Sequence, residues 1–487
     1  MYLANDKSLT KLRSNFKKLK IGLCHGVFDI IHQGHLDHFR EAKNKVDILV
    51  VSVTSSSFVN KGPRQPLNND FKRVSFLKSI KYIDYIYLNK RPGSSKIISL
   101  LKPNVYFKGL DYIKSDHHGN LKSELKYLKK NKGSIIFTKT KLQSSTKIFN
   151  KNYDWSSQQR DFLKDMSKIK YNNFLQIFEK LSDETINIIG EPIIDRYIYC
   201  DIVGTTSKDP AISVMQSKNL DIGGGVVAAA KMAANFVKHV NLITYGNLKL
   251  IKKLIYPYKN IKIKLVSKKK IQHKTRFINS NREEKLLQST NFRNNNFNDK
   301  DYSLFIKEIR KIKKDIIICD FGVGLFKNQL LKFINKLRVK KFVNVQSNSI
   351  NLGFNLFTKY KKAEYMCLDT REWMLGLRSE KIDEKNLKKN LRSFKNISIT
   401  KGKQGSTFIS NKSSIYTPVF VKSVKDTTGS GDAYFILTSL LKRLSINEKI
   451  IPFIGNLYAG MHGQNLGNKI IVKKSELLRN VKSIVNI

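Results

Sequence analysis

The residues in this chain best suited to chemistry are two histidines in a glycine-containing stretch, Gly26 to His35. The stretch follows a short apolar run, Ile21 to Cys24, and leads into a helix-like segment, Leu36 to Lys43. A glycine-rich turn between a strand and a helix lets backbone N–H groups approach a phosphate, and the helix N-terminus favours negative charge. His32 and His35 can both face an anion bound there and offset the charge of a leaving pyrophosphate. An H-x-x-H pair alone would equally suit a metal site or two surface histidines.

The complete string G-V-F-D-I-I-H-Q-G-H resembles the signature of the cytidylyltransferase-like nucleotidyltransferases. The resemblance implies that His32 and His35 are catalytic and that Gly26, Phe28 and Asp29 contribute to nucleotide or phosphate binding. A sugar phosphate oxygen would attack the α-phosphorus of a nucleoside triphosphate. Mg²⁺ bridging the phosphates is expected on general grounds.

Further candidate phosphate contacts follow the histidine motif along the first 150 residues. They are Lys61 after a β-rich run, Arg73 on a helix, Lys108, Gly109 and Asp111 at a strand end, and Ser144, Ser145, Thr146 and Lys147 at a helix start. In this order they resemble the adenylyltransferase half of bifunctional ADP-heptose synthases. Related glycerol-phosphate cytidylyltransferases tend to carry G-D-D-W where this chain has K-G-L-D-Y, so ATP is the expected donor and CTP the alternative. Thr54-Ser55-Ser56 departs from the N-S-D triplet usual there.

A second chemical unit lies near the C-terminus, where D-T-T-G-S-G-D-A-Y-F (Asp426 to Phe435) precedes an apolar helix. Small residues before a helix present backbone N–H groups to a transferring phosphoryl group, for which the candidates are Thr428, Gly429, Ser430 and Gly431. Asp432 at the same turn can accept a proton from an attacking hydroxyl.

This string resembles the anion-hole and catalytic-base signature of ribokinase-like sugar kinases. Upstream, G-E-P-I-I-D-R-Y resembles the opening of the heptose-phosphate kinase half of the same bifunctional enzymes. The resemblance assigns sugar binding to Asp195, Arg196, Gly223, Gly224 and Gly225, and nucleotide binding to the turn containing Thr400, Gly402 and Gly405. It also assigns Glu372 an indirect role at Mg²⁺.

Several positions depart from that kinase pattern. Glu191 replaces an Asp, Val227 stands where an Asn commonly contacts the sugar, and Asp369 replaces the Asn of an N-x-x-E motif. Asn344 and Gln346 stand where an Asp and a Lys are common. Because Val cannot supply the hydrogen bonds of Asn, the sugar or its binding mode can differ. Glu372 and Asp432 remain, so we expect an active kinase, with a degenerate sugar-binding module as the alternative.

The elements that must position these residues alternate between strands and helices. Strands are predicted at 48–53, 85–88, 105–108 and 134–138, and helices at 70–80 and 96–101. This alternation is typical of a doubly wound α/β fold with a mostly parallel sheet. We predict a nucleotidyltransferase domain at 1–150, a linker at 151–171 and a ribokinase-like α/β domain at 172–487.

Composition limits the remaining classes. The 487 residues are too many for one ordinary core, and no apolar run reaches the roughly 18 residues of a membrane helix. The polar N-terminus does not read as a secretory signal, and four widely spaced cysteines suit buried thiols in a reducing cytoplasm. The net charge of +52 comes from lysines spread along the whole chain rather than gathered in one stripe. We therefore expect no specific nucleic-acid partner, although an RNA-binding protein stays an alternative.

Together the two units predict a bifunctional enzyme that makes a nucleotide-activated sugar. The kinase would phosphorylate a sugar phosphate, in this resemblance a heptose 7-phosphate, at its anomeric hydroxyl. The transferase would then cap it with a nucleotide to give an ADP-sugar for surface polysaccharide such as lipopolysaccharide. The transferase comes first in this chain, the reverse of the usual bifunctional enzyme. A different sugar and CTP remain alternatives, and a homodimer is a further expectation.

Overall fold

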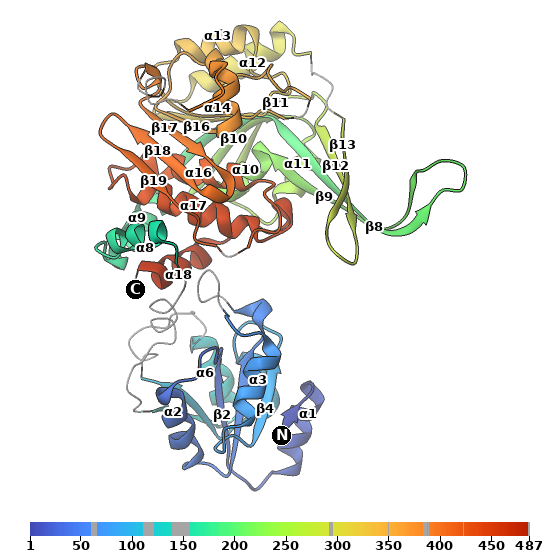
Figure 1. The fold of residues 1–487 in the computed structure, drawn as a ribbon, viewed down its shortest axis with the longest axis vertical. Coiled ribbons are helices and arrows are strands. Elements are labelled where there is room, and N and C mark those ends of the chain that lie inside the picture. The colour runs from blue at the N-terminus through green and yellow to red at the C-terminus, as the bar shows by residue number, and fades with distance from the viewer. Residues whose placement is uncertain are drawn as a thin grey trace. The chain divides into compact units, whose positions relative to one another are not determined.

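The computed structural model describes residues 1–59, 66–110, 121–138, 155–291, 296–348, 350–382, 387, 389–421 and 423–485. The chain divides into two compact units. Unit 1 comprises Met1–Trp155 with Lys482–Ile487, and unit 2 comprises Ser156–Val481 (Figure 1). No helix among the described residues is long and apolar enough to cross a membrane.

Unit 1 is built on a six-stranded sheet in the order β1-β4-β3-β2-β5-β6, with every neighbouring pair parallel. Its strands are β1 (Tyr2–Leu3), β2 (Ile21–Gly26), β3 (Ile48–Thr54), β4 (Tyr85–Asn89), β5 (Val105–Gly109) and β6 (Ser134–Thr138). The chain runs outward from β2 through β3 to β4 and then returns to β5 on the other side of β2. The strand order therefore reverses between β2 and β5, which is where doubly wound folds bind ligands, beyond the carboxyl ends of the strands.

Helices cover both faces of this sheet. One core cluster joins the sheet to α1 (Asp6–Asn15), α4 (Ser95–Leu101) and α6 (Leu121–Lys130), and the other joins it to α2 (Gln33–Lys43) and α3 (Asp70–Lys78). A short 3₁₀ helix, η1 (Ser56–Phe58), follows β3. The alternation predicted from the sequence is confirmed for this unit. The N-terminal pair β1 and α1 is an addition, because that polar, lysine-rich segment was assigned no structure.

Unit 2 is built on a nine-stranded sheet in the order β11-β10-β7-β14-β15-β16-β17-β18-β19, parallel from β11 to β17 and antiparallel beyond. Its strands are β7 (Thr185–Gly190), β10 (His239–Tyr245), β11 (Ile261–Ser267), β14 (Asp315–Asp320), β15 (Lys340–Val345), β16 (Tyr365–Asp369), β17 (Asn396–Thr400), β18 (Ser406–Ser410) and β19 (Ser414–Thr417).

Neighbouring residues of β16 show how this sheet is covered on both faces. Tyr365 stacks on Phe435 and shares a hydrogen bond with Thr438, both on α16 (Ser430–Lys442), whereas Met366 belongs to the core cluster on the opposite face. Alternating strand residues point to opposite faces, so α16 lies on one side and the other cluster on the second. The helices of unit 2 are α8 (Ser157–Met166), α9 (Tyr171–Ser182), α10 (Val226–Ala234), α11 (Leu248–Ile255), α12 (Asp299–Arg310), α13 (Asn328–Lys336), α14 (Thr370–Leu377), α16 (Ser430–Lys442), α17 (Ile450–Gly463) and most of α18 (Lys474–Val485), with 3₁₀ helices η2 (Phe357–Lys359), η3 (Gly402–Gln404) and η4 (Gly467–Lys469).

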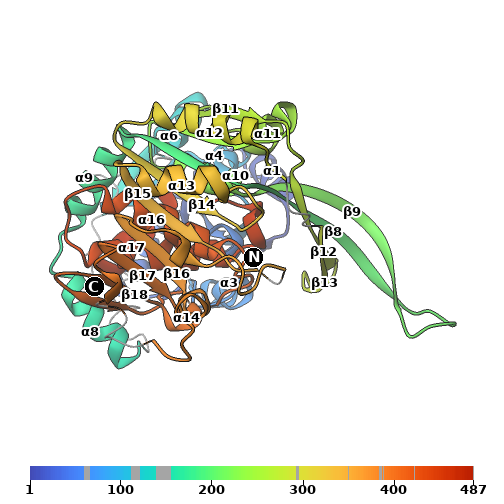
Figure 2. The ribbon, with the colours of Figure 1, turned by 90° about the horizontal axis from the view of Figure 1, so that it is seen from above.

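A separate four-stranded sheet, in the order β13-β12-β8-β9, completes unit 2. It contains β8 (Pro192–Thr205), β9 (Ile212–Gly225), β12 (Gln272–Asn279) and β13 (Lys285–Asn291). The distal half of the β8–β9 hairpin extends as a long two-stranded arm (Figure 2). The sequence analysis missed this sheet, although it contains all five residues expected to bind sugar.

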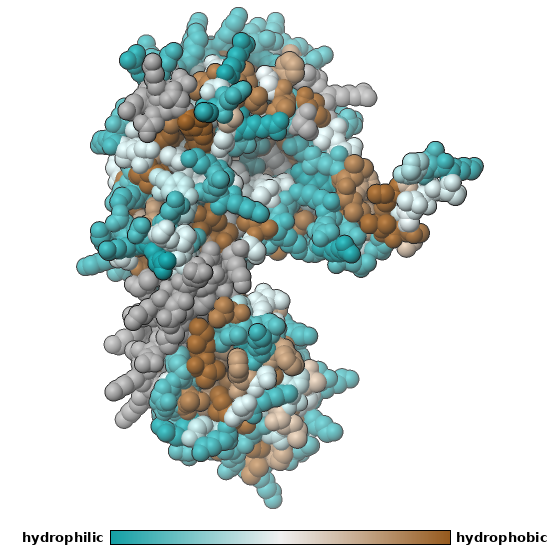
Figure 3. Space-filling view, viewed as in Figure 1, coloured by the Kyte–Doolittle hydropathy of each residue, from teal (hydrophilic) through white to brown (hydrophobic). Residues whose placement is uncertain are grey.

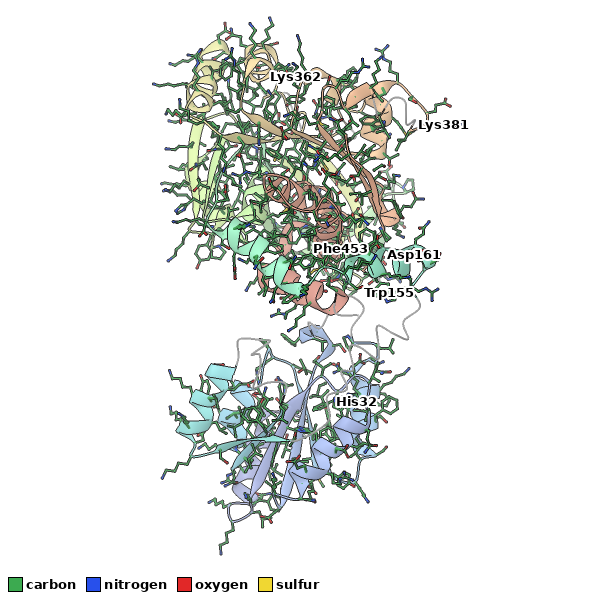
Figure 4. All side chains as sticks on the ribbon, turned by 90° about the vertical axis from the view of Figure 1, so that its left-hand side faces the viewer. His32, Trp155, Asp161, Lys362, Lys381 and Phe453 are labelled. Atoms are coloured by element: carbon green, nitrogen blue, oxygen red, sulfur yellow. The ribbon has the colours of Figure 1, made fainter. Side chains whose placement is uncertain are left out.

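The predicted linker at 151–171 differs from the structure over its described part, residues 155–171. Residues 157–166 form α8, whose N-terminus carries a capping box between Ser156 and Gln159. The ring of Phe162 packs on Phe420 and Phe453, and Leu163 is buried (Asp161 and Phe453 are labelled in Figure 4). This segment is therefore a packed part of unit 2, because its apolar side chains complete that core.

Candidate active sites

The histidine motif lies at the carboxyl end of β2, beside the point where the strand order of unit 1 reverses. His32 is the N-cap of α2 and His35 lies on its first turn, with ring centroids 4.0 Å apart (His32 is labelled in Figure 4). Phe28 has a left-handed backbone, with φ of 48°, and its ring meets His35 edge-on and approaches Gly26. The structure thus brings four predicted residues together at one helix N-terminus, which suits an anion.

Two further histidines, which the sequence analysis left out, lie beside this pair. His25 Nδ1 is 3.1 Å from Ser52 Oγ, and His38 Nδ1 is 2.7 Å from Thr138 Oγ1. Burial lowers the pKa of His38 to about 4, so this ring is neutral and joins α2 to β6. The spacing H-x-x-H-x-x-H across residues 32–38 was the available signal.

Asp29 serves the loop rather than the nucleotide. Its two carboxylate oxygens accept the backbone N–H groups of Leu67 and Asn68 at 2.6 and 2.8 Å. The side-chain amide of Asn68 donates to the Asp29 carbonyl at 2.9 Å. The carboxylate therefore holds the segment before α3 against the histidine loop.

Arg73 contradicts its predicted role as a triphosphate ligand. The side chain is fully buried, and its five N–H donors all reach protein oxygens at 2.6 to 3.1 Å. The acceptors are the carbonyls of Asn68, Val27 and Thr54 and the side chains of Ser56 and Asp70. A guanidinium has only five donors, so none is left for a phosphate. Arg73 instead ties together the ends of β2 and β3 and the start of α3.

Lys108 is also committed within the domain. Its ammonium is 3.1 Å from Glu124 Oε2 and lies 5.1 Å from the centroid of the Tyr106 ring. Both charged side chains are buried, and Glu124 also accepts a hydrogen bond from Ser94. The two charges of such a buried pair neutralise each other, so the contact is structural. The sequence analysis had instead expected Lys108 to bind a phosphate. Gly109 follows at the end of β5.

Six predicted transferase residues lie outside the residues that the structure describes. They are Lys61, Asp111, Ser144, Ser145, Thr146 and Lys147.

In unit 2 the predicted catalytic base, Asp432, lies buried in the first turn of α16. Burial raises its pKa to about 7, while a hydrogen bond from Gln346 and the charge of Lys274 act in the opposite direction. Gly429, the N-cap, has a φ of 80°, and a Cβ there would come 2.3 Å from Asn468 Oδ1. Only glycine fits this position. A Cβ on Gly431 would meet nothing within 4 Å, so this turn faces open space as a phosphoryl site requires.

Glu372 lies beyond the carboxyl end of the neighbouring strand β16. Its Oε1 accepts the backbone N–H of Ser347 and its Oε2 that of Asp369, both at 2.8 Å. Burial raises the pKa of Glu372 to about 8, and the charges of Asp369 and Asp432 add to the effect. Glu372 is thus destabilised as a carboxylate by two further carboxylates at this edge of the sheet, an effect that a bound cation would relieve.

Asp195 faces the same region from β8. Its Oδ1 is 2.5 Å from Arg276 Nη1, and its Oδ2 accepts a hydrogen bond from Asn468 at 3.3 Å. A Cβ on Gly224 would come 2.3 Å from Asp195 Oδ2, so a glycine at that position of β9 makes room for the carboxylate. The charge of Asp195 also raises the pKa of Asp432, which places the predicted sugar ligand near the base.

Arg196 does not join this group, contrary to the prediction. Neighbouring residues of a strand point to opposite faces, and the guanidinium of Arg196 forms a bidentate pair with Asp221 at 2.7 and 2.8 Å. The cations near Asp195 come instead from β12, where Lys274 and Arg276 lie two residues apart and therefore share a face. Their K-x-R spacing in a β-rich segment was the signal that the sequence analysis overlooked.

The other kinase positions differ in how they are used. Thr400 ends β17, and Gly402 and Gly405 form the turn into β18, both with positive φ. Thr428 Oγ1 accepts a hydrogen bond from Lys285, which also pairs with Asp426 at 2.6 Å. Gly223 and Gly225 are buried at the end of β9.

Two departures from the kinase pattern have structural explanations. The buried carboxylate of Glu191 accepts three backbone N–H groups at 2.8 to 2.9 Å, from Phe321, Val323 and Leu325. Val227 is fully buried in α10. Glu191 therefore shapes the loop after β14, and Val227 packs in the core.

Comparisons with known proteins agree with this geometry for each unit. A family model described as cytidylyltransferase-like matches residues 23–157. Among curated proteins, the bifunctional protein HldE of Campylobacter jejuni is 34% identical over 111 residues, covering 22% of this chain and 24% of that protein. The HldE proteins of Aliarcobacter butzleri and Helicobacter pylori are 33% and 32% identical over 133 and 115 residues, covering 26% and 23% of this chain and 28% and 25% of those proteins. The matches thus span about a quarter of these relatives.

Among solved structures, phosphofructokinase-2 from Escherichia coli in complex with substrates and products superimposes with a TM-score of 0.51 at 13% identity. The superposition covers 61% of this chain and 99% of that structure, so it shows the fold alone. The chain is therefore an α/β protein in which a region that matches the cytidylyltransferase-like family model precedes a domain with the fold of phosphofructokinase-2.

Proposed function

We propose that this chain synthesises a nucleotide-activated sugar in two steps, from a sugar phosphate and two nucleoside triphosphates. The kinase domain phosphorylates the anomeric hydroxyl, and the transferase domain then adds a nucleotide. The observation that carries the proposal is the cluster of Asp432, Asp195, Arg276 and the half-buried Lys274 at the carboxyl edge of the unit 2 sheet. Such a cluster provides a base, a hydroxyl acceptor and cations in one place.

In the kinase step, the anomeric oxygen attacks the γ-phosphorus of ATP and ADP leaves. Asp432 accepts the hydroxyl proton, and the N-terminus of α16 stabilises the transferring phosphoryl group. Asp195, held by Arg276, orients the sugar through its hydroxyls. Because Lys274 and Arg276 carry positive charge on the face toward Asp432 and Asp195, we expect an anionic sugar, such as a heptose 7-phosphate.

In the transferase step, an oxygen of the sugar 1-phosphate attacks the α-phosphorus of the nucleotide and pyrophosphate leaves. His32 and His35 at the N-terminus of α2 stabilise the charge on the phosphates. ATP is the proposed donor and an ADP-sugar the proposed product, with CTP as the alternative. HldE-like relatives support this choice only over the transferase region.

The residues present fit a magnesium ion that enters with the nucleotide. Within the described ranges, no group of three His, Cys, Asp or Glu side chains could enclose a metal. Mg²⁺ commonly takes one or two carboxylates and completes its shell with phosphates and water. Glu372 and Asp369 would hold it through water, where it neutralises the phosphates. The four cysteines are free and buried, which suits our assignment to the reducing cytoplasm.

The experiment that tests this function is product analysis by mass spectrometry. The purified full chain is incubated with ATP or CTP, Mg²⁺ and a panel of heptose and hexose phosphates, and in parallel with the corresponding sugar 1-phosphates. We expect an ADP-sugar from both sets. Product from the 1-phosphates alone would mean a non-catalytic kinase domain, and product from neither set would refute the proposal. Retention on immobilised RNA at moderate salt would instead favour the RNA-binding alternative.

We also propose a homodimer formed through the β8–β9 arm. Ile202, Val203, Ile212 and Met215 on this hairpin are 49 to 67% exposed, and Figure 3 shows apolar side chains along it. Exposure of apolar side chains to water is unfavourable. A second copy of the chain, related by a twofold axis, would cover these side chains on both hairpins. Sedimentation of the wild type and of Met215→Lys tests this: we expect a dimer that the variant weakens, and a monomeric wild type would refute it.

A further inference from the structure

The catalytic carboxylate of unit 2 has a neutral amide as its hydrogen-bond partner. Gln346 Nε2 donates to Asp432 Oδ1. Gln346 lies one residue beyond the end of β15, and its own backbone is held on both sides. Its N–H donates to the Asp320 carbonyl at 2.8 Å, and its carbonyl accepts from Asn355 at 3.1 Å. These two backbone hydrogen bonds hold Gln346 in place, with its side-chain amide beside the Asp432 carboxylate.

A second amide sets the orientation of the first. Asn344, two residues earlier on the same face of β15, donates from Nδ2 to the backbone carbonyl of Cys367 at 2.9 Å. A carbonyl only accepts, so the NH₂ end of Asn344 must face it and the oxygen must face Gln346. Gln346 Nε2 donates to that oxygen at 3.1 Å, which leaves its second N–H for Asp432. The Cys367 carbonyl therefore fixes which ends of Asn344 and Gln346 donate, and with them the N–H that reaches the base.

The other groups near Asp432 come from several elements. Lys274 on β12 and Asp195 on β8 influence its charge, and Asp432 in turn influences Glu372 on α14. Two buried thiols, Cys319 on β14 and Cys367 on β16, also sense its charge. Burial raises the pKa of both thiols, so they stay neutral. Among these groups, Lys274 is the one cation. In the proposed function its charge attracts the anionic sugar.

We propose that Asn344 and Gln346 are positioning residues for the kinase base, which occupy Asp432 Oδ1 and leave Oδ2 to accept the proton of the sugar hydroxyl. This inference rests on the proposed kinase function. A neutral donor orients the carboxylate without adding a positive charge that would weaken it as a base. Proton affinity near neutrality is what a general base requires at physiological pH.

Substitutions of Gln346 should shift the pH dependence of the kinase in opposite directions. Gln346→Lys places a cation beside the carboxylate, so the acidic limb of the kcat/KM profile should move down by at least about one pH unit. Gln346→Met removes a hydrogen bond to the ionised form, so the limb should move up. It should also lower kcat about 10- to 100-fold with little change in KM for ATP. Asn344→Leu should resemble Gln346→Met with a smaller effect.

A matched control is available on the surface of the same unit. Gln329 on α13 donates a hydrogen bond to the exposed Asp299. Gln329→Lys therefore adds the same charge as Gln346→Lys, but beside an exposed carboxylate instead of the buried base. This variant should keep the wild-type profile. Unchanged limbs in both Gln346 variants, or shifts in the same direction, would overturn the inference.

A second measurement does not depend on catalysis. The pKa of Asp432 is raised by burial from 3.8 to about 7, so this group stabilises the fold at acidic pH and loses that stabilisation as pH rises toward 7. Relative to Asp432→Asn, the wild-type melting temperature should therefore fall between about pH 4 and pH 7 and level off above.

The same comparison, with and without Asp432→Asn in each Gln346 variant, reports the pKa of the Asp432 carboxylate without any activity measurement. With Gln346→Lys the fall should end at lower pH, and with Gln346→Met it should extend to higher pH. An inactive wild type with these shifts would refute the kinase function and retain the pairing of Gln346 with Asp432. An active wild type without them would refute the pairing alone.

Discussion

The two candidate sites of this chain use positive charge in opposite ways. In unit 1, Arg73 and Lys108 belong to segments expected to bind phosphate, yet both are buried against protein acceptors. In unit 2, Lys274 and Arg276 were not expected at all, yet they face the carboxylates of Asp432 and Asp195. In unit 1 the acceptors are loop and strand-end groups that these cations hold together, whereas in unit 2 they include Asp195, the residue predicted to bind the sugar. The difference teaches that the partner of a cation, rather than its closeness to a motif in the sequence, decides its role.

The two sites also differ in what stabilises the transferring group. The transferase motif offers a pair of imidazoles at a helix N-terminus, whereas the kinase motif offers a carboxylate base at such an end. Under the proposed function, the first arrangement stabilises charge and the second removes a proton. Variants of the two sites should therefore separate the two half-reactions.

Asp432→Asn should produce the largest separation. It keeps the size of the side chain and removes the base, so kcat for sugar-dependent ADP release should fall by roughly 10²–10⁴. Transfer to a supplied sugar 1-phosphate should continue at the wild-type rate. Equal ADP release by wild type and variant would show that Asp432 is not the base.

Arg73→Met should act on stability rather than on phosphate binding. Removing a buried cation leaves Asp70 and several carbonyls without their donor, so unfolding of unit 1 should become easier by about 3–5 kcal/mol. The matched control is Arg40→Met, because Arg40 is an exposed partner of Asp37 and should cost at most about 1 kcal/mol. Thermal denaturation of both variants makes the comparison. A fully stable Arg73→Met with a raised KM for the nucleotide would restore the phosphate-binding role.

His32→Ala and His35→Ala should each slow nucleotidyl transfer by about 10²–10³, as for loss of one group that stabilises transition-state charge. Sugar phosphorylation should be unchanged, because its proposed base lies in the other unit. Rates are measured as pyrophosphate release from supplied sugar 1-phosphate. Wild-type rates in both variants would place the transferase site elsewhere.

The smallest effect concerns the boundary between the units. A fragment that begins at residue 156 keeps α8, whereas one that begins at 172 loses the buried side chains of Leu163 and Met166. Each such side chain contributes about 1.5–3 kcal/mol, part of which ordering the helix offsets. The longer fragment should therefore melt a few degrees higher in calorimetry. Equal melting temperatures of the two fragments would show that residues 156–171 act as a linker and do not stabilise unit 2.

The sequence predicted the architecture well where the signal is local. Alternating strands and helices identified the doubly wound sheet of unit 1. A helix was expected after the string from Asp426 to Phe435, whereas α16 begins within that string, at Ser430. Two missed elements also carry local signals. Both α1 and α8 begin with a capping box, at Asn5 with Ser8 and at Ser156 with Gln159. Such boxes mark helix starts even in polar segments.

What the sequence determined by itself was the kind of chemistry, because the histidine and D-T-T-G-S-G-D motifs contain their glycines, side chains and helix starts within ten residues. Only the tertiary structure decided which partners complete each site. Gln346 reaches Asp432 across 86 residues of chain, and Arg276 reaches Asp195 across 81. Such contacts depend on strand order and register, which arise from packing of the whole sheet rather than from any local pattern. For the same reason Arg73 became a structural residue: its carbonyl acceptors exist only once β2, β3 and α3 have come together.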